Sequence, residues 1–210
     1  MSGETAGGFL MTQAKTKQQD KTFKIVGLSI LTAIIIVLQV VTTYFPTKPF
    51  AITLALIPIV IGAALFGKGA GAYLGAVFSA VVVVMCVIGA DLGGAMIFNS
   101  NPALCIIMCM LKGTAAGFTA GVVYTAVAKK NQILGAVLAA LCAPIVNTGI
   151  FIIGTLLFFR ETLQVWAGGT DVLFYAIFIM TGVNFLVELG VNVILSPVIV
   201  RVVNAVRKSK

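Results

Sequence analysis

The sequence contains no histidine and only one tryptophan, and charged side chains make up just 10% of its 210 residues. Without histidine, the chain has no imidazole for general acid–base catalysis, for proton transfer or for metal binding. It also lacks the GxxxxGK[ST] phosphate-binding loop and the GxSxG and HExxH motifs of hydrolases. These absences predict a protein that is not an enzyme, with no catalytic residues, no cofactor and no metal site.

Apolar residues dominate what is present. They make up 60% of the chain, and the mean hydropathy is +1.13. Soluble domains average about 45–50% apolar and about 25% charged residues, so this chain has too little polar surface to cover itself in water. The net charge of +8 lies mostly in short loops and at the termini. The composition therefore indicates an integral membrane protein and does not favour a nucleic-acid partner.

Six stretches are apolar enough to cross a bilayer, which requires about 20 such residues per helix. They cover residues 23–45, 50–66, 69–89, 102–128, 132–159 and 171–200. Each is bounded by proline, glycine, asparagine or charge, as helix ends require. The prolines Pro58, Pro144 and Pro197 are expected to interrupt the second, fifth and sixth stretches. The sequence thus predicts an all-α integral membrane protein, a six-transmembrane-helix bundle.

Basic residues predict its orientation, because cytoplasmic loops are enriched in lysine and arginine. With the N-terminus inside, eleven basic residues lie on the cytoplasmic side and only two, Lys48 and Arg160, on the other. We therefore expect both termini to be cytoplasmic in a multi-pass protein of the plasma membrane. Residues 1–22 are predicted to be a disordered tail, 23–204 the six-helix membrane domain and 205–210 a basic tail. The long outer loops, 90–101 and 160–170, are where a lid over a binding site would lie.

Two charged side chains, Lys112 and Glu188, fall well inside the spans. Each would cost at least about 2.5 kcal/mol if it faced lipid at the membrane centre, so both should point into the bundle. A structural ion pair between Lys112 and Glu188 is one interpretation. The other places Lys112 beside an anionic group of a substrate.

Amides within and above the spans predict a polar pocket in the outer half of the bundle. The candidate substrate-binding residues are Gln39, Asn99, Asn101, Lys112, Asn147 and Asn184. Asn184, Glu188 and Asn192 are four residues apart and share one helical stripe. Such amides either bind neighbouring helices or face a polar ligand. The pocket suits a small polar molecule, neutral or mildly anionic.

Small residues at four-residue spacing predict close helix contacts. Gly113, Gly117 and Gly121 form one such stripe, and Gly71 and Gly75 form another. A third, Ser29 and Ala33, is either a packing surface or an interface with another membrane protein. The four cysteines, at positions 86, 105, 109 and 142, lie in apolar runs without a CxxC motif. They are interpreted as small core residues.

The order of motifs resembles the substrate-binding (S) components of energy-coupling factor (ECF) vitamin transporters. The resemblance covers about residues 25–200. It rests on the six short spans and on Ser29 and Ala33, which stand where the family has its alanine motif on the first helix. It also rests on six short runs: IPIVIGAALFG (57–67), GAYLG (71–75), NP (101–102), KG (112–113), AG (116–117) and NTG (147–149). It implies a subunit that binds a vitamin from outside. A transmembrane coupling subunit carrying two ATPases would dock on the first helices, and toppling of the S component would deliver the substrate inward.

The sequence leaves the identity of the substrate open. With one tryptophan, the chain offers little sign of a multi-aromatic cage for a thiamin-like cation. Lys112 with amides suits a small hydroxylated carboxylate such as pantothenate; cobalamin, folate, riboflavin, pyridoxine-type and hydroxymethylpyrimidine-type substrates are alternatives. Two other classes stay open: a self-sufficient secondary transporter coupled to ions through Glu188, and a structural or assembly membrane protein.

Overall fold

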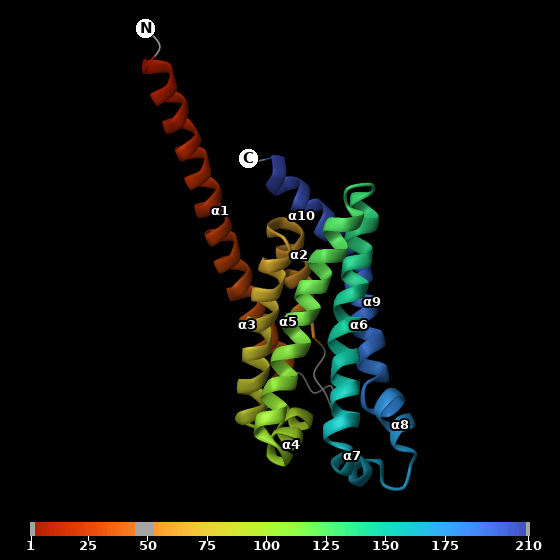
Figure 1. Ribbon diagram of the computed structural model, residues 1–210. Coiled ribbons are helices and arrows are strands. Elements are labelled where there is room, and N and C mark those ends of the chain that lie inside the picture. Colours follow the sequence, from red (N-terminus) through yellow and green to blue (C-terminus); the bar gives the residue numbers. More distant parts are fainter. Residues whose placement is uncertain (1–2, 45–52, 209–210) are drawn as a thin grey trace.

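The computed structural model describes residues 3–44 and 53–208, without the side chains of residues 3–17, 183 and 207, and these residues form helices and short connections with no strand. The helices follow one another as α1 (Gly3–Tyr44), α2 (Leu56–Phe66), α3 (Lys68–Val87), α4 (Leu92–Ser100), α5 (Pro102–Val127), α6 (Gln132–Phe158), α7 (Arg160–Ala167), α8 (Val172–Phe174), the π-helix η1 (Tyr175–Met180), α9 (Gly182–Ile194) and α10 (Ser196–Lys208). The long helices α3, α5 and α6 run side by side with α9, the short helices α4, α7 and α8 lie at one end of the bundle, and α1 begins and α10 ends at the other end (Figure 1).

The predicted helical membrane bundle is confirmed. Helices α3, α5, α6 and residues 18–44 of α1 are each long and apolar enough to cross a membrane. Two bent pairs raise the number of spans to six if each pair counts as one: α7 with residues 172–180, bent by 92°, and residues 184–194 with 196–206, bent by 41°. The expected single span over 171–200 is therefore broken by η1 and by the bend before α10. Helix α2 has only 11 residues, and residues 50–52 of the expected second span lie outside the described ranges.

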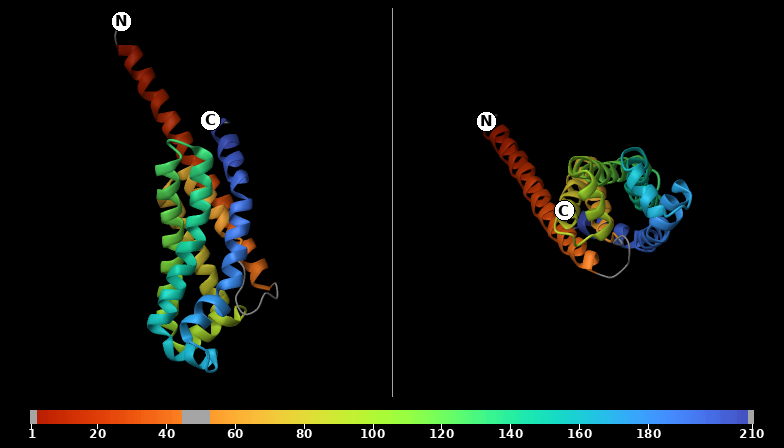
Figure 2. Two further views of the ribbon diagram at one scale, coloured as in Figure 1. Left: turned by 90° about the vertical axis from the view of Figure 1, so that its right-hand side faces the viewer. Right: turned by 90° about the horizontal axis from the view of Figure 1, so that it is seen from below.

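Several local expectations need correction. The segments 90–101 and 160–170, expected to be loops on the outer side, contain the helices α4 and α7. Residues 3–22, expected to be a disordered tail, continue α1 as helix, and α1 projects past the rest of the bundle (Figure 2). Pro144 does not interrupt its span, because α6 runs through it from Gln132 to Phe158. Pro58 lies in the first turn of α2, where proline is tolerated, and Pro197 follows the bend at the start of α10.

Short polar side chains fix the starts of four helices. Asp91, Asn101, Asn131 and Asp171 each accept a hydrogen bond from the backbone N–H three residues later, at 3.1, 3.1, 3.0 and 2.8 Å respectively. Such caps satisfy N–H groups that the first helical turn leaves without partners. They set where the short helices α4 and α8 and the long helices α5 and α6 begin.

Glycines allow α3 and α5 to cross in backbone contact. A Cβ at Gly71 would collide with the carbonyl oxygen of Gly117, and one at Gly75 would collide with that of Gly113. The predicted packing role of these stripes is confirmed. Close backbone approach is the form of helix association expected in lipid, where apolar side chains gain little from burial.

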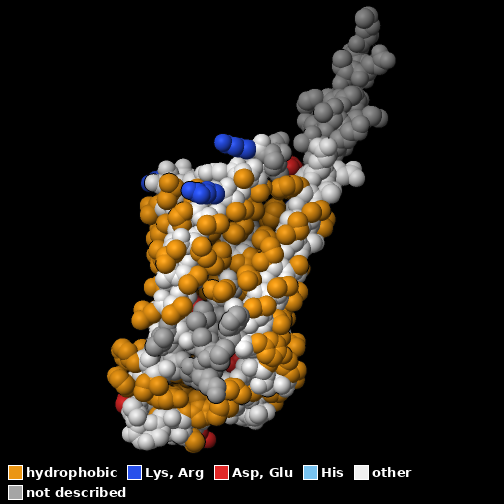
Figure 3. Space-filling model, turned by 180° about the vertical axis from the view of Figure 1, so that it is seen from behind, with side chains coloured by type: hydrophobic (Ala, Val, Ile, Leu, Met, Phe, Trp, Pro, Cys, Tyr) orange, Lys and Arg blue, Asp and Glu red, His pale blue; other side chains and the backbone are white. Residues whose placement is uncertain are grey.

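The outer surface matches a membrane environment. Apolar side chains are spread over the face shown in Figure 3, and the lysine and arginine side chains visible on it lie at the end that carries the termini. This end includes the exposed pair Lys129 and Lys130 between α5 and α6. The placement agrees with the side that the sequence assigns to the cytoplasm, although which side faces inward stays a prediction.

Candidate functional site

A cavity opens between the helices on the side of the bundle away from the termini. It holds about 720 Å³ of space not occupied by atoms, counting the part open to solvent. Its walls come from α1, α3, α4, α5, α6, η1 and α9 and from Thr53 ahead of α2. Because this space includes the part open to solvent, the side chains that line the cavity, and not its volume, indicate what it can bind.

Four of the six predicted binding residues line this cavity: Gln39 on α1, Lys112 on α5, Asn147 on α6 and Asn184 on α9. Gln39 and Asn147 are only 3% and 5% exposed. Gln39 donates from Nε2 to Thr43 Oγ1 at 3.2 Å, but its Oε1 has no hydrogen-bond partner, and neither has Asn147 Oδ1. An unsatisfied buried polar atom costs about 1–3 kcal/mol, so two such acceptors in one cavity favour a ligand that donates hydrogen bonds.

The other two predicted residues do not reach the cavity. Asn99 is exposed on α4, and Asn101 is the N-cap of α5, where its Oδ1 accepts from the Leu104 N–H at 3.1 Å. Asn101 therefore organises the entrance of α5 and is not among the cavity residues. The proline that follows it marks the same helix start, because proline is favoured in the first turn of a helix.

Lys112 places a cation against an aromatic ring. The side chain is half-buried, and Nζ lies 4.8 Å from the centroid of the Phe151 ring on α6. Lys112 is the eleventh residue of α5, about 15 Å along the helix from Pro102. A positive charge at this depth is stabilised by the ring face and can attract an anionic group that enters the cavity.

Glu188 has a different partner from the one the sequence predicts. It is 4% exposed, and its Oε1 accepts a hydrogen bond from the backbone N–H of Thr53 at 2.8 Å. Lys112 and Glu188 line the same cavity, but within the described part of the chain they form no direct ion pair. The expected structural ion pair is therefore corrected to two separate contacts: Lys112 with an aromatic ring, and Glu188 with the segment that leads into α2.

The two asparagines of the stripe on α9, Asn184 and Asn192, have different surroundings. Asn192 is fully buried, and its Nδ2 donates to the carbonyl oxygen of Glu188 at 2.8 Å, one turn away on the same helix. Asn184 lies nearer the start of α9 and lines the cavity. Of the two amides, only Asn184 is placed to meet a ligand.

Sequence reasoning missed a carboxylate and three thiols in the cavity wall. Asp91, the N-cap of α4, lines the cavity, and burial raises its pKa, opposed in part by the Gly94 N–H and by Lys112. Cys86, Cys105 and Cys109 also line it, and their sulfur atoms all lie within 4.8 Å of one another. The signal for this cluster was a CxxxC spacing on α5, but its third member comes from a different helix.

The proposed partner residues lie on an open face. Ser29 and Ala33 are both exposed on α1, and Ser29 Oγ donates back to the Ile25 carbonyl oxygen at 3.0 Å, so its hydroxyl needs no further partner. Ile30, Ile34 and Val37 are exposed near them. This part of α1 therefore presents small and apolar side chains away from the bundle.

A comparison with protein families decides between the broad classes. The family model for the ECF transporter substrate-specific component matches residues 23–200, nearly the whole of the bundle. The chain belongs to this family. The S component is thus a multi-pass protein of the plasma membrane, and its family consists of substrate-binding subunits of transporters. No curated protein matches the S component in sequence.

Proposed function

We propose that this S component captures a small hydroxylated carboxylate, with pantothenate as the best candidate, in the cavity of Gln39, Lys112, Asn147 and Asn184. The observation that carries the proposal is the pair of buried carbonyl oxygens without partners, Gln39 Oε1 and Asn147 Oδ1, in the same cavity as a lysine. Hydroxyl and amide N–H groups of the ligand would donate to these two oxygens. Its carboxylate would bind Lys112, because charge-assisted hydrogen bonds are the strongest available to such a group.

The remaining charges of the cavity agree with one anionic group at Lys112. Glu188 is already engaged by the Thr53 N–H and Asp91 by the Gly94 N–H at 3.1 Å. A ligand carboxylate placed near either would meet like charge whenever these groups are ionised. The polar but uncharged end of the ligand therefore belongs on the amide side, toward α1 and α6.

ATP-driven uptake would require a partner, because the sequence contains no phosphate-binding loop of its own. We propose that a transmembrane coupling subunit with two ATPases docks on the α1 face around Ser29 and Ala33. Small residues let two helices approach closely in lipid, and both residues are exposed. Substrate would enter from outside, at the end of the bundle away from the termini, and be released inward by the ATP-driven complex.

The test is native mass spectrometry of the purified chain with a panel of vitamins, followed by affinity measurements on two variants. Asn147→Ala should weaken binding of the selected ligand by about tenfold or more, because a buried hydrogen bond is lost. Asn99→Ala is the matched control, since Asn99 is exposed and outside the cavity. Equal affinity in both variants, or selection of an organic cation from the panel, would contradict the proposed site.

A second experiment addresses the secondary-transporter alternative through Glu188. The S component alone, reconstituted in liposomes, should bind substrate but not accumulate it under a proton or sodium gradient. Accumulation that disappears in Glu188→Gln would favour ion-coupled transport and overturn the proposed dependence on an ATPase module.

A further inference from the structure

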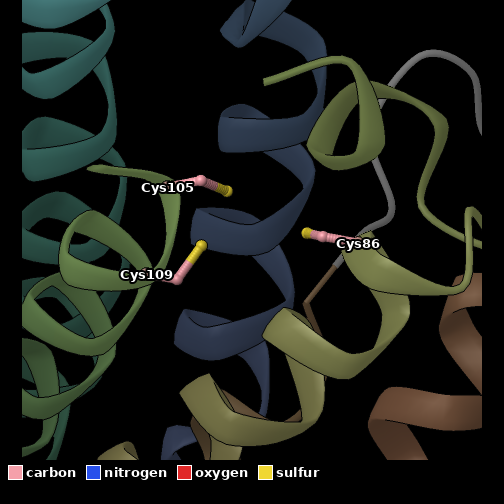
Figure 4. A group of neighbouring side chains, drawn as sticks. All are labelled: Cys86, Cys105 and Cys109. Atoms are coloured by element: carbon pink, nitrogen blue, oxygen red, sulfur yellow. The ribbon is translucent and has the colours of Figure 1, made fainter. Parts of the chain in front are cut away.

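We propose that Cys86, Cys105 and Cys109 form a binding site for one thiophilic divalent metal ion, with Zn²⁺ as the ion that fits their chemistry. Cys105 and Cys109 are one turn apart on α5, and Cys86 lies in the last turn of α3. Figure 4 shows the three side chains pointing toward one another across the gap between these helices. The site does not depend on which substrate the S component carries.

The spacing of the sulfur atoms is close to that of a metal–thiolate site. All three lie within 4.8 Å of one another. With Zn–S bonds of about 2.3 Å, ligand sulfurs in tetrahedral or trigonal geometry are roughly 3.8–4.0 Å apart. Each sulfur would move by less than about 1 Å, which a small change in side-chain torsion supplies. Two helices that are held together by glycine contacts elsewhere along their length therefore present three ligands without a backbone rearrangement.

The surroundings separate this cluster from ordinary buried cysteines. All three residues are buried, at 1–3% exposure, yet all three line the cavity. The absence of a side chain at Gly94 makes room for the Cys86 sulfur, because a Cβ there would collide with Cys86 Sγ and lie 3.1 Å from the Asp91 carboxylate. Cys142, in contrast, lies on α6 outside the cluster and outside the cavity wall.

Charge favours a divalent ion. Three thiolates around Zn²⁺ carry a net charge of −1, and the Lys112 ammonium, three residues after Cys109 on the same helix and in the same cavity, compensates it. Binding converts three S–H groups to thiolates and releases three protons to solvent, with no redox change. Three protein ligands leave a fourth position for water or a ligand oxygen, as in zinc sites that bind substrates.

The test begins with the reduced, metal-free, full-length protein titrated with Zn²⁺ alone. We expect one ion per chain to remain after desalting, and X-ray absorption of the wild-type protein to show about three sulfur ligands at about 2.3 Å. Cys109→Ser should weaken Zn²⁺ binding on the order of a hundredfold, the share of one thiolate in a typical site. Cys142→Ser, the matched control, should bind as tightly as the wild type.

The spectroscopic result keeps the proposal falsifiable even if Cys109→Ser fails to fold. Substoichiometric Zn²⁺, a coordination shell of nitrogen and oxygen only, or full binding by a folded Cys109→Ser variant would each overturn it. Loss of vitamin binding with Zn²⁺ binding intact would contradict the substrate proposal and leave the metal site standing.

Discussion

Lys112 offers the sharpest test of the substrate class, because its effect depends on one group of the ligand. Replacing Lys112 by Gln removes the charge but keeps a polar side chain of similar reach. A hydrogen bond to a charged group contributes about 1.5–3 kcal/mol, so the variant should bind pantothenate about 10- to 150-fold more weakly. Phe151, 4.8 Å from Nζ, stays in place and keeps the wall of the cavity.

The assay is a two-by-two comparison by isothermal titration calorimetry. Wild type and Lys112→Gln are each titrated with pantothenate and with pantothenol, in which a neutral hydroxymethyl group replaces the carboxylate. If Lys112 binds the carboxylate, the wild type prefers the acid and the variant loses most of that preference, which isolates the pairwise energy. The reasoning is refuted if the substitution weakens acid and alcohol by the same factor, because Lys112 would then act only through the shape of the cavity.

Three further changes probe the partner face, the helix contact and the capping carboxylate. Ala33→Trp should leave substrate affinity unchanged but abolish co-purification with the coupling subunit. Ala80→Trp, on the exposed side of α3, is the control and should still co-purify with the coupling subunit. Gly75→Ala should destabilise the protein by about 1–3 kcal/mol in thermal unfolding, because its Cβ would collide with the facing α5 carbonyl. Gly69→Ala, with no atom within 4 Å of the added Cβ, should leave the stability unchanged. Equal melting temperatures of the Gly75→Ala and Gly69→Ala variants would contradict the close contact between α3 and α5. Burial raises the pKa of Asp91 above 3.8, so wild-type stability should fall as the pH rises from about 4 through that raised value. Asp91→Asn, which keeps the capping oxygen, should flatten this dependence; an unchanged pH profile would exclude Asp91 as its source.

The elements that sequence predicted best are those whose physics is local. The span of α5 could be predicted from three local signals: a long apolar run, an Asn-Pro start and a lysine pair after its end. The predicted span, 102–128, differs from the structure by one residue. The glycine stripes were interpretable for the same reason, since four-residue spacing places them on one face before any partner is known. The helices in the outer loops were missed, although Asp91 was a capping signal for α4.

The cavity required information that no single segment contains. Four predicted residues converge in it, since each is a polar group that lipid would not tolerate. Asn101 was wrongly predicted to bind substrate. An asparagine before proline can cap a helix N-terminus or bind a ligand, and the sequence alone does not distinguish these roles. The cysteine cluster was missed because two of its members are on α5 and the third is on α3. The sequence does not show which residues of α3 and α5 lie opposite one another where the two helices cross.

Glu188 shows why the same buried charge can be read in two ways. In the sequence its nearest candidate partner is the other intramembrane charge, Lys112, and that pairing would leave the cavity without a cation for a substrate. In the structure the Thr53 N–H satisfies Glu188 Oε1 at 2.8 Å, which ties α9 to the segment entering α2. A carboxylate held by the backbone does not consume the lysine. The cation therefore stays in the cavity wall beside Phe151, where an anionic group of a substrate can reach it.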